Sequence, residues 1–440
     1  MRQEIESYVR SLGLDAYLVG GAVRDELLGL ESKDADFLVP GVDTEQLRAA
    51  LAPHGRVDDL VVAGRLVGIR LRPSDRKIGA LTPAGIEFAP PRAERSTGPG
   101  RHDFEIVADP SLSVEDDMRR RDFTVNAMAR RLETGEIVDP VGGRADLEAR
   151  ILRTVSPQSF REDPLRLIRA LRFVSQLGFE PDTTLLAQMR ENAAGVEFVS
   201  GERIGGGLAA DGMGELSKLL LGTQPAKALR IARATGVLAQ LIPEFGACDE
   251  GLCGHIFKVV QETADAGDDL AVRLATLFHD VGKPIDRDPL GHARVAAEIA
   301  DKTLLRLRYP TRLSRRVVAI VREHPFRAED LPRTPRDVRR FLAQHGDELA
   351  FDLVAHRRAD LRAKDKDATP VEELGAALRR EQANPHRLGD LAIDGTDLIE
   401  LGFRPGPALG RALEALLAEV VDEPKLNTRD ELLARAKGLL

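Results

Sequence analysis

Two cysteines and the lack of any long apolar run set the first limits on this sequence of 440 residues. A membrane-spanning helix needs roughly 20 consecutive apolar residues, and no stretch approaches that length. Residues 1–13 have the pattern of an amphipathic helix and lack the apolar core of a signal peptide. Cys248 and Cys253 fall short of the about four ligands of a structural zinc site, so we interpret them as ordinary thiols. We therefore expect a cytoplasmic protein with no membrane partner.

Net positive charge is also lacking, because 71 acidic residues outnumber 63 Lys and Arg and leave a formal charge of −8. Phosphates bind to positive surfaces, so this total taken alone argues against a nucleic-acid partner. The arginines are clustered, however, with three in succession at residues 119–121 and five between residues 306 and 316. Clusters rather than totals form binding surfaces, so RNA binding stays open.

Hydrophobic residues make up 43% of the chain, enough for several buried cores, and the usual domain size predicts about three domains. Before residue 150, helical segments alternate with short β-type runs such as LVGIRL and GIEFAP. After it, apolar residues recur at helical spacing and no strand is expected. The predicted fold class is α+β, with a small sheet domain followed by helices. The predicted domains are residues 1–150, 151–245, 246–365 and 366–440.

Asp34 and Asp36 stand two residues apart at the start of an apolar β-type run. Alternate side chains of a strand lie on the same face, so the two carboxylates point the same way. Divalent metals held by such a pair neutralise charge on the oxygens of a transferred phosphate, as nucleotidyl transfer requires. An isolated pair is also common in turns and on surfaces, and by itself it indicates little.

A glycine-rich turn precedes this pair. Gly20 and Gly21 end a β-type run and open a helix, and Arg24 falls in the first turn of that helix. Such a turn exposes backbone N–H groups to a phosphate, and a guanidinium adds a bidentate donor. Glycine turns also serve simply to let a helix pack on a strand. Together with the carboxylates, however, the turn favours a site for a nucleoside triphosphate.

The run GGAVRDELLGLESKDADF, residues 20–37, resembles the signature of the tRNA nucleotidyltransferase and bacterial poly(A) polymerase family, in the DNA polymerase beta superfamily. Residues 120–127, RRDFTVNA, resemble the second motif of that family, and residues 139–147, DPVGGRADL, resemble its third. The resemblance implies a class II enzyme with a mixed-sheet nucleotidyltransferase head and a helical neck that recognises the base. It also implies Mg²⁺ as cofactor and tRNA, CTP and ATP as partners.

The same resemblance implies roles for individual residues. Asp34 and Asp36 are the catalytic carboxylates that hold Mg²⁺, and Glu87 is similar in placement to the third active-site carboxylate. In the second motif, the Asp and Asn hold the nucleotide sugar and the arginines face phosphate. The implied nucleotide-binding residues are Gly20, Gly21, Arg24, Arg121, Asp122, Asn126, Asp163, Arg166 and Arg169.

Asp163 and Arg166 stand three residues apart at the start of a predicted helix, where they share a face. A carboxylate accepts the exocyclic amine of cytosine or adenine while a guanidinium donates to the neighbouring ring nitrogen. Uracil and guanine present carbonyl oxygens instead and leave the carboxylate unpaired, at a cost of ~1–3 kcal/mol. Asp before Pro is also a common helix cap, and one carboxylate can do both. The Glu-Asp-x-x-Arg motif of the family, which residues 162–166 resemble, implies selection of CTP and ATP.

Two loops bear on the product. Three glycines in succession interrupt the expected helical pattern, so we interpret residues 205–213 as an inserted loop whose role the sequence does not define. The Gly-, Pro- and Ser-rich stretch at residues 94–113 has the full length that accompanies addition of the terminal A in the resembling family. Its length favours addition of CCA, or of A alone.

A second set of metal-binding residue types lies between residues 250 and 365. Imidazoles and carboxylates on helices suit a divalent transition metal, which polarises phosphate and activates water. The order of these residues resembles the HD phosphohydrolase superfamily, which implies a first metal held by His255, His279, Asp280 and Asp360. His292 and His324 are candidates for a second ion. The resemblance implies 2′,3′-cyclic phosphodiesterase, 2′-nucleotidase or phosphatase activity, and the alternative is a helical platform with a vestigial site.

The sequence therefore predicts a CCA tRNA nucleotidyltransferase with an additional metal-dependent phosphohydrolase domain. An A-adding enzyme or a poly(A) polymerase of the same family is the nearest alternative. A phosphohydrolase whose head only binds RNA, and a non-catalytic RNA-binding scaffold, are alternatives of other classes. The sequence does not define the transition metal, the oligomeric state or the role of the helical tail.

Overall fold

The computed structural model describes residues 2–30, 36–62, 65–96, 104–206, 212–326 and 331–440 of the chain. Asp34, one of the two predicted catalytic aspartates, lies outside these ranges, as do residues 207–211 of the predicted inserted loop. The chain divides into two compact units. The first contains residues 1–204 and 227–241, and the second contains residues 205–226 and 242–440.

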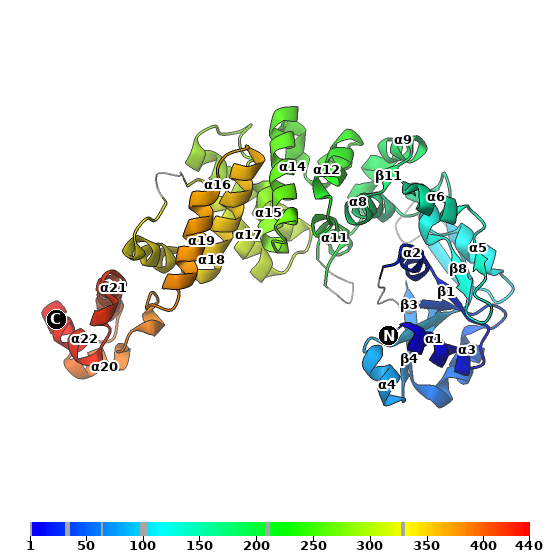
Figure 1. The fold of residues 1–440 in the computed structure, drawn as a ribbon, viewed down its shortest axis with the longest axis horizontal. Coiled ribbons are helices and arrows are strands. Elements are labelled where there is room, and N and C mark those ends of the chain that lie inside the picture. The colour runs from blue at the N-terminus through cyan, green and yellow to red at the C-terminus, as the bar shows by residue number, and fades with distance from the viewer. Residues whose placement is uncertain (1, 31–35, 63–64, 97–103, 207–211, 327–330) are drawn as a thin grey trace. The chain divides into compact units, whose positions relative to one another are not determined.

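The first unit is built on a mixed seven-stranded sheet, in blue and cyan in Figure 1. The strand order is β3-β4-β5-β2-β1-β8-β9, in which β2 and β5 pair in parallel and the other neighbours are antiparallel. The strands are β1 Tyr17–Val19, β2 Asp36–Leu38, β3 Gly55–Val62, β4 Arg65–Pro73, β5 Ile86–Ala89, β8 Ala129–Arg131 and β9 Ile137–Val138. A separate antiparallel hairpin joins β6 (Arg92–Ser96) to β7 (Phe104–Ala108).

Apolar side chains of the central strands hold this sheet against its helices. Phe37 of β2 stacks on Phe88 of β5 with 5.5 Å between ring centroids. Val19 and Leu38 belong to a buried cluster that includes Met118 of α5. The helices of the unit are α1 Arg2–Ser11, α2 Gly21–Leu27, α3 Thr44–Leu51, α4 Arg76–Leu81, α5 Val114–Arg119, α6 Gly143–Ala149, α7 Ser159–Glu162, α8 Leu165–Leu177, α9 Thr183–Asn192, α10 Gly201–Ile204 and α13 Val237–Leu241.

Two short strands follow residue 150, where the sequence predicts helices alone. β10 (Ile151–Leu152) pairs in parallel with β11 (Glu180–Pro181). Each has only two residues, too few for the alternation of apolar and polar residues that reveals a strand, so this part of the prediction is wrong. The wider prediction of an α+β fold, with a small mixed sheet followed by helices, is confirmed.

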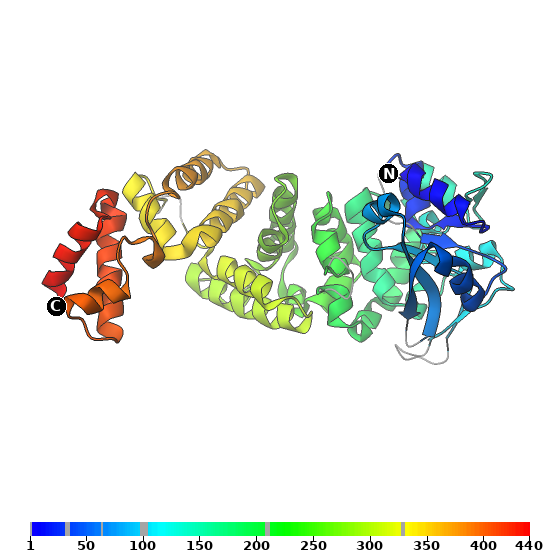
Figure 2. The same ribbon diagram turned by 90° about the horizontal axis from the view of Figure 1, so that it is seen from below.

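The second unit is helical, in green to red in Figures 1 and 2. Its helices are α11 Glu215–Leu220, α14 Glu250–Asp265, α15 Leu270–Phe278, α16 Pro289–Arg306, α17 Thr311–Glu323, α18 Pro335–Ala363, α19 Thr369–Glu381, α20 Gly395–Leu401, α21 Pro407–Asp422 and α22 Arg429–Ala436; α12 Pro225–Ala234 joins the two units. α18 bends at Gly346, whose φ of 72° and ψ of 165° are not helical. Leu398, Leu416 and Leu432 belong to a small core that α20, α21 and α22 share.

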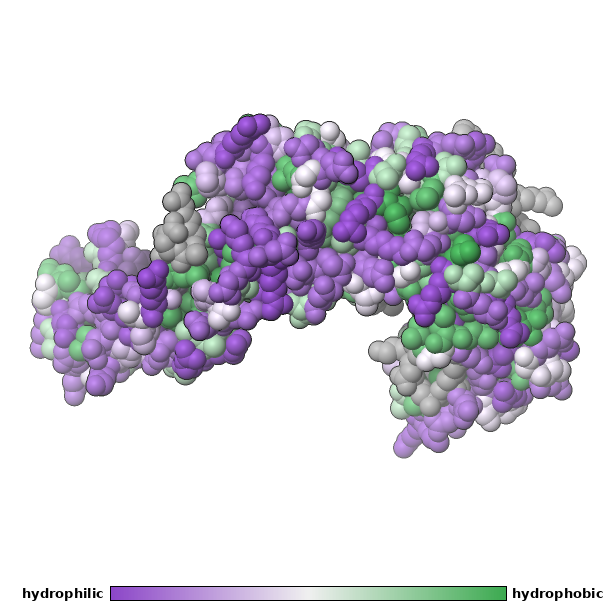
Figure 3. Space-filling view, turned by 45° about the horizontal axis from the view of Figure 1, so that its top comes forward, coloured by the Kyte–Doolittle hydropathy of each residue, from purple (hydrophilic) through white to green (hydrophobic). Residues whose placement is uncertain are grey.

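Apolar side chains are gathered inside the two units. Phe88, Phe123 and Phe278 are among the largest fully buried side chains. Figure 3 shows hydrophilic residues over much of the visible surface, with hydrophobic residues in patches between them. In the part of the chain that the structure describes, no helix combines the length and apolar character needed to cross a membrane.

Candidate active site and metal centre

A cavity of about 660 Å³ opens in the first unit beside β1, β2 and α8. It is lined by every predicted catalytic or nucleotide-binding residue that the structure describes, namely Gly20, Gly21, Arg24, Asp36, Glu87, Arg121, Asp122, Asn126, Asp163, Arg166 and Arg169. The structure therefore brings this set together in one place, and we call this space the head cavity. Asp34, two residues before Asp36, lies outside the described residues.

The turn between β1 and α2 requires glycine at its first position. Gly20 has a φ of 71°, which side chains rarely adopt. A Cβ at Gly20 would lie 2.5 Å from Nη1 of Arg121, so a larger residue would displace that guanidinium. Arg24, one turn into α2, donates from Nη1 to Oδ1 of Asn126 over 2.6 Å. Gly20 in the turn therefore leaves room for Arg121 of the second motif. In return, Asn126 of that motif holds Arg24, which follows the turn.

The parallel pairing of β2 and β5 aligns two of the predicted carboxylates. Asp36 lies directly opposite Glu87 in the register. Aligned residues of neighbouring strands project to the same face of a sheet, so both side chains face the cavity. Glu87 accepts a hydrogen bond from Nε of Arg70 over 3.1 Å. One predicted catalytic carboxylate therefore already has a cationic partner within the sheet.

Asp122 and Asn126 form a buried hydrogen-bonded pair at the cavity wall. Nδ2 of Asn126 donates to Oδ1 of Asp122 over 3.0 Å, and Nε of Arg169 lies 2.9 Å from Oδ2. Burial by itself would raise the pKa of Asp122, but the charge of Arg169 and the hydrogen bond from Asn126 lower it below its ordinary value. Asp122 therefore stays an anion that holds Arg169 toward the cavity.

Asp117 is a contributor to the site that the sequence analysis missed. Its side chain is fully buried at the end of α5 and pairs with two arginines that line the cavity. Nη2 of Arg120 lies 2.5 Å from Oδ1, and Nη2 of Arg121 lies 3.1 Å from Oδ2. The spacing of three and four residues places all three side chains on one face, and this is the sequence signal for the arrangement.

Asp163 and Arg166 both line the cavity and both have further partners. Oδ1 of Asp163 accepts the backbone N–H of Leu165 over 3.0 Å, so the capping role is present. Nη2 of Arg203 donates to Oδ2 of Asp163 over 2.8 Å, a contact that the sequence analysis did not predict. Nη1 of Arg166 donates to Oγ of Ser159 over 3.0 Å. These contacts hold the carboxylate and the guanidinium in defined positions.

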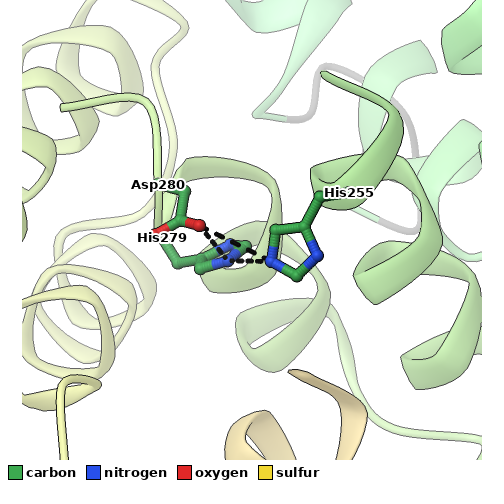
Figure 4. Close-up of side chains that lie close together, drawn as sticks. All are labelled: His255, His279 and Asp280. Atoms are coloured by element: carbon green, nitrogen blue, oxygen red, sulfur yellow. Dashed lines mark hydrogen bonds and ion pairs between the residues drawn. The ribbon is translucent and has the colours of Figure 1, made fainter. Parts of the chain in front are cut away.

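A second cluster lies inside the helical unit, where helices and helix ends converge. It contains His255 on α14, His279 and Asp280 after α15, His292 on α16, His324 after α17, and Asp360 on α18. Ligand atoms lie within 4.8 Å of one another in two groups, His255 with His279 and Asp280, and Asp280 with His292 and His324. Figure 4 shows the first group, in which the His255 ring and the Asp280 carboxylate are linked to the His279 ring.

Three of these histidines have a defined ring orientation. Nδ1 lies close to a backbone carbonyl in each: His279 to Thr276 at 2.7 Å, His292 to Asp288 at 2.9 Å, and His324 to Val321 at 2.7 Å. A carbonyl oxygen only accepts, so each Nδ1 carries a proton and donates it. Each Nε2 of a neutral ring is then left with a lone pair for a metal ion.

The distances within the cluster fit metal binding. Nε2 of His292 and Nε2 of His324 are 3.3 Å apart, and two lone pairs at that separation repel each other unless a cation lies near both. Oδ2 of Asp280 lies 3.2 Å from Nε2 of His279, whereas Oδ1 lies 3.4 Å from Nε2 of His292. Asp280 therefore turns one oxygen toward each group. Imidazole nitrogens with carboxylate oxygens are the donors of a transition-metal site.

The charge states of three members, Asp280, Asp360 and His324, also fit metal binding. Burial would raise the pKa of Asp280, but His279 and other neighbours hold it well below its ordinary value. Burial would likewise raise the pKa of Asp360, which the hydrogen bond with His255 lowers instead. Burial lowers the pKa of His324 to about 3, so this ring is neutral at pH 7. Ionised carboxylates and a neutral imidazole are the states in which these groups bind metals.

His356 belongs to the same cluster, and the sequence analysis missed it. It lies on α18, one turn before Asp360. Its ring centroid is 5.1 Å from that of His279 and 5.2 Å from that of His324. The spacing of four residues from Asp360 puts both on one helix face, which is the signal that the sequence offered.

Three protein-family models match the chain. They are the poly(A) polymerase head domain over residues 16–153, the probable RNA and SrmB-binding site of polymerase A over residues 178–248, and the HD domain over residues 252–364. A multifunctional CCA protein of Thioalkalivibrio sulfidiphilus is 33% identical over 447 residues, which cover 94% of this chain and 99% of that protein. The chain belongs to the multifunctional CCA protein family. The predicted membership in the tRNA nucleotidyltransferase and poly(A) polymerase family, with an HD-type domain, is thus confirmed.

Other members and solved structures agree. A multifunctional CCA protein of Cupriavidus necator is 33% identical over 337 residues, which cover 71% of this chain and 75% of that protein. The crystal structure of the Bacillus stearothermophilus CCA-adding enzyme in complex with CTP has 26% identity and a TM-score of 0.67, and the match covers 99% of this chain and 95% of that chain. The Thermotoga maritima CCA-adding enzyme complexed with tRNA, at 20% identity and a TM-score of 0.59, shares the fold.

Proposed function

We propose that the head cavity adds C, C and A in turn to the 3′ end of tRNA, using CTP and ATP and releasing pyrophosphate. One observation carries this proposal: a single cavity is lined by the glycine turn, an aspartate of β2 and the Asp163–Arg166 pair. Phosphate binding, metal binding and base recognition are thereby available at one place. Relatives that are multifunctional CCA proteins, and a CCA-adding enzyme of this fold with bound CTP, support the same function.

Asp34 and Asp36 would hold Mg²⁺, since carboxylate oxygens are the ligands that this ion prefers. When bound, Mg²⁺ supplies charge neutralisation at the phosphate that is transferred. Arg24 and Arg121 line the cavity and would bind the triphosphate through their guanidinium groups. The 3′-hydroxyl of tRNA would attack the α-phosphate, and the bond to the departing pyrophosphate would break.

Base selection would depend on Asp163 and Arg166. Oδ2 of Asp163 is held by Arg203, and Arg166 is held by Ser159, so neither group is free to turn toward a wrong base. The carboxylate accepts the exocyclic amine of C or A, and the guanidinium donates to the ring nitrogen. UTP and GTP offer a carbonyl oxygen at the amine position, so the hydrogen bond from the base to the carboxylate would be lost, at a cost of ~1–3 kcal/mol.

The test is incorporation of each labelled nucleoside triphosphate, with Mg²⁺, into matched tRNA transcripts. These end before CCA, after C, and after CC. We expect CTP to be used on the first two transcripts and ATP on the third alone. Addition of A only, with no use of CTP, would instead assign the A-adding activity, and long A tails on other RNAs would assign poly(A) synthesis. The reaction would take place in the cytoplasm, where tRNA and both triphosphates are present.

We further propose a phosphohydrolase activity at the His–Asp cluster, where the transition metal, when bound, polarises a phosphate and activates water. His255, His279, Asp280 and Asp360 would hold a first ion. The supporting observation is that buried carboxylates contact imidazole nitrogens, Asp360 with His255 at 3.2 Å and Asp280 with His279 at 3.2 Å. Hydrolysis of a nucleoside 2′,3′-cyclic phosphate that depends on an added transition metal is the expected result. No hydrolysis with any first-row divalent ion would leave the cluster a structural platform.

A further inference from the structure

His356 is a polar side chain buried inside the second unit. Its residue is 1% exposed, and neither Nδ1 nor Nε2 has a hydrogen-bond partner among the described residues. Buried polar groups in native proteins are nearly always paired, because an unpaired one costs ~1–3 kcal/mol. The other histidines of the cluster with assigned orientations satisfy Nδ1 with a backbone carbonyl. A partner other than protein is therefore expected at His356.

The position of the ring indicates what that partner is. The centroids of His356 and His324 are 5.2 Å apart, which equals the separation of His292 and His324, whose Nε2 atoms face each other. The ring of His356 also lies 5.1 Å from that of His279, which is itself 5.5 Å from the ring of His324. The ring thus packs against one member of each ligand group, at about the centroid separation that His292 and His324 also have.

The two groups are connected through one carboxylate. Oδ2 of Asp280 faces His279 and His255, at 3.2 and 3.5 Å, and Oδ1 faces His292 and His324, at 3.4 and 3.8 Å. A carboxylate that turns one oxygen to each of two sets of imidazoles is arranged as a bridge between two ions. Among the residues that the structure describes, the second set contains His292 and His324 besides this bridge. A further nitrogen would complete the four ligands of a typical site.

We propose that His356 is a further ligand of the second ion, the one for which the HD-type resemblance offers His292 and His324. This inference rests on the metal centre proposed above. Three imidazoles with one carboxylate oxygen select a first-row transition metal such as Co²⁺, Ni²⁺ or Zn²⁺ over Mg²⁺. A bound ion would also satisfy the ring of this buried histidine, which has no hydrogen-bond partner in the described part of the chain.

The test counts ions and does not depend on activity. The full chain is stripped of transition metals and titrated with Co²⁺ by equilibrium dialysis, in millimolar Mg²⁺ so that the carboxylates of the head cavity are saturated. Bound cobalt is then measured by mass spectrometry. We expect two Co²⁺ per chain for the unchanged protein. His356→Gln should keep the first ion and weaken the second by more than the about 10- to 100-fold that loss of an outer partner of a ligand costs.

Two controls keep the test interpretable. His356→Phe preserves the ring volume and has no nitrogen, so it should also lose the second ion while its circular dichroism and melting temperature show that it folds. His345→Gln changes a histidine of the same helix whose ring packs against Phe341 outside the cluster, and this variant should bind two ions.

The outcomes separate the two proposals. Two ions with unchanged affinities in both His356 variants would overturn the ligand role of His356. One ion in the unchanged protein would overturn the two-ion centre and leave the first site intact. No cobalt binding at all would remove the proposed metal centre, and this inference with it.

Discussion

Single side chains determine what the head cavity can bind. Asp36 projects from β2 beside Glu87, which Arg70 neutralises. Asp163 lies between α7 and α8 and is held by Arg203. The two aspartates line one cavity but have different surroundings, which suits one to a metal and the other to a base.

Removal of the Asp36 carboxylate tests the first of these roles. Asp36→Ala should lower nucleotide incorporation by at least ~10³-fold, because charge on the transferred phosphate is no longer neutralised. Its affinity for tRNA, measured by filter binding, should stay within the range of the unchanged protein. Glu45→Ala, an exposed carboxylate on α3, is the matched control and should keep full incorporation. Full incorporation by Asp36→Ala would show that the site is wrongly assigned.

Asp163→Asn tests base recognition. Asparagine still accepts the backbone N–H of Leu165, so the helix cap is kept, but its amide also donates to a carbonyl oxygen. We expect discrimination against UTP to fall by about 10- to 100-fold, as the kcat/KM ratio of CTP to UTP reports. Arg203→Gln removes the partner of Asp163 and leaves the carboxylate in place. An equal loss of discrimination in both variants would assign Asp163 a purely structural role.

The site residues that belong to compact sequence motifs could be predicted. The contacts between segments far apart in the sequence could not. The turn at Gly20 and the carboxylate at Asp36 follow from local spacing, and both line the cavity. The pairing of Arg203 with Asp163 joins residues 40 positions apart, and no local pattern encodes it. His356 was missed for another reason, because a histidine on a helix is usually part of the core.

At the level of elements, the β1–α2 turn is the most constrained part of the head. Gly20→Ala should destabilise the chain by roughly 1–3 kcal/mol, because alanine is strained at this φ, and should raise the KM for CTP by displacing Arg121. Gly13 has a similar φ of 73°, and a Cβ there would meet no atom within 4 Å. Gly13→Ala therefore introduces the backbone strain without the clash and serves as the control. Thermal unfolding and steady-state kinetics measure the two effects. An unchanged KM for Gly20→Ala would contradict the role of the turn.

The order of elements follows from periodicity, but their pairing does not. The switch from β-type runs to helical spacing near residue 150 predicts the mixed-sheet head and the helices after it. The parallel pairing of β2 with β5 brings Asp36 level with Glu87, although 51 positions separate them, and the sequence contains no signal for that register. The two-residue strands β10 and β11 are too short to show an alternation.

At the scale of the whole molecule, two sets of donor groups with different metal preferences lie in two compact units. Carboxylate oxygens in the head suit Mg²⁺, and imidazoles in the helical unit suit a transition metal. A chelator such as 1,10-phenanthroline, which binds transition metals and not Mg²⁺, should therefore stop cyclic-phosphate hydrolysis and spare nucleotide addition in the same sample. Added Co²⁺ or Ni²⁺ should restore hydrolysis. Joint loss of both activities would contradict the assignment of separate metals.

The central claim is that this chain builds CCA without a template, and the sequence of its product tests it most directly. A tRNA transcript that ends before CCA is incubated with the chain, Mg²⁺ and all four nucleoside triphosphates together, and the new 3′ ends are sequenced. The account predicts that most extended molecules carry CCA and then stop. Homopolymeric tails, incorporated U or G, or transcripts that remain unextended would contradict it.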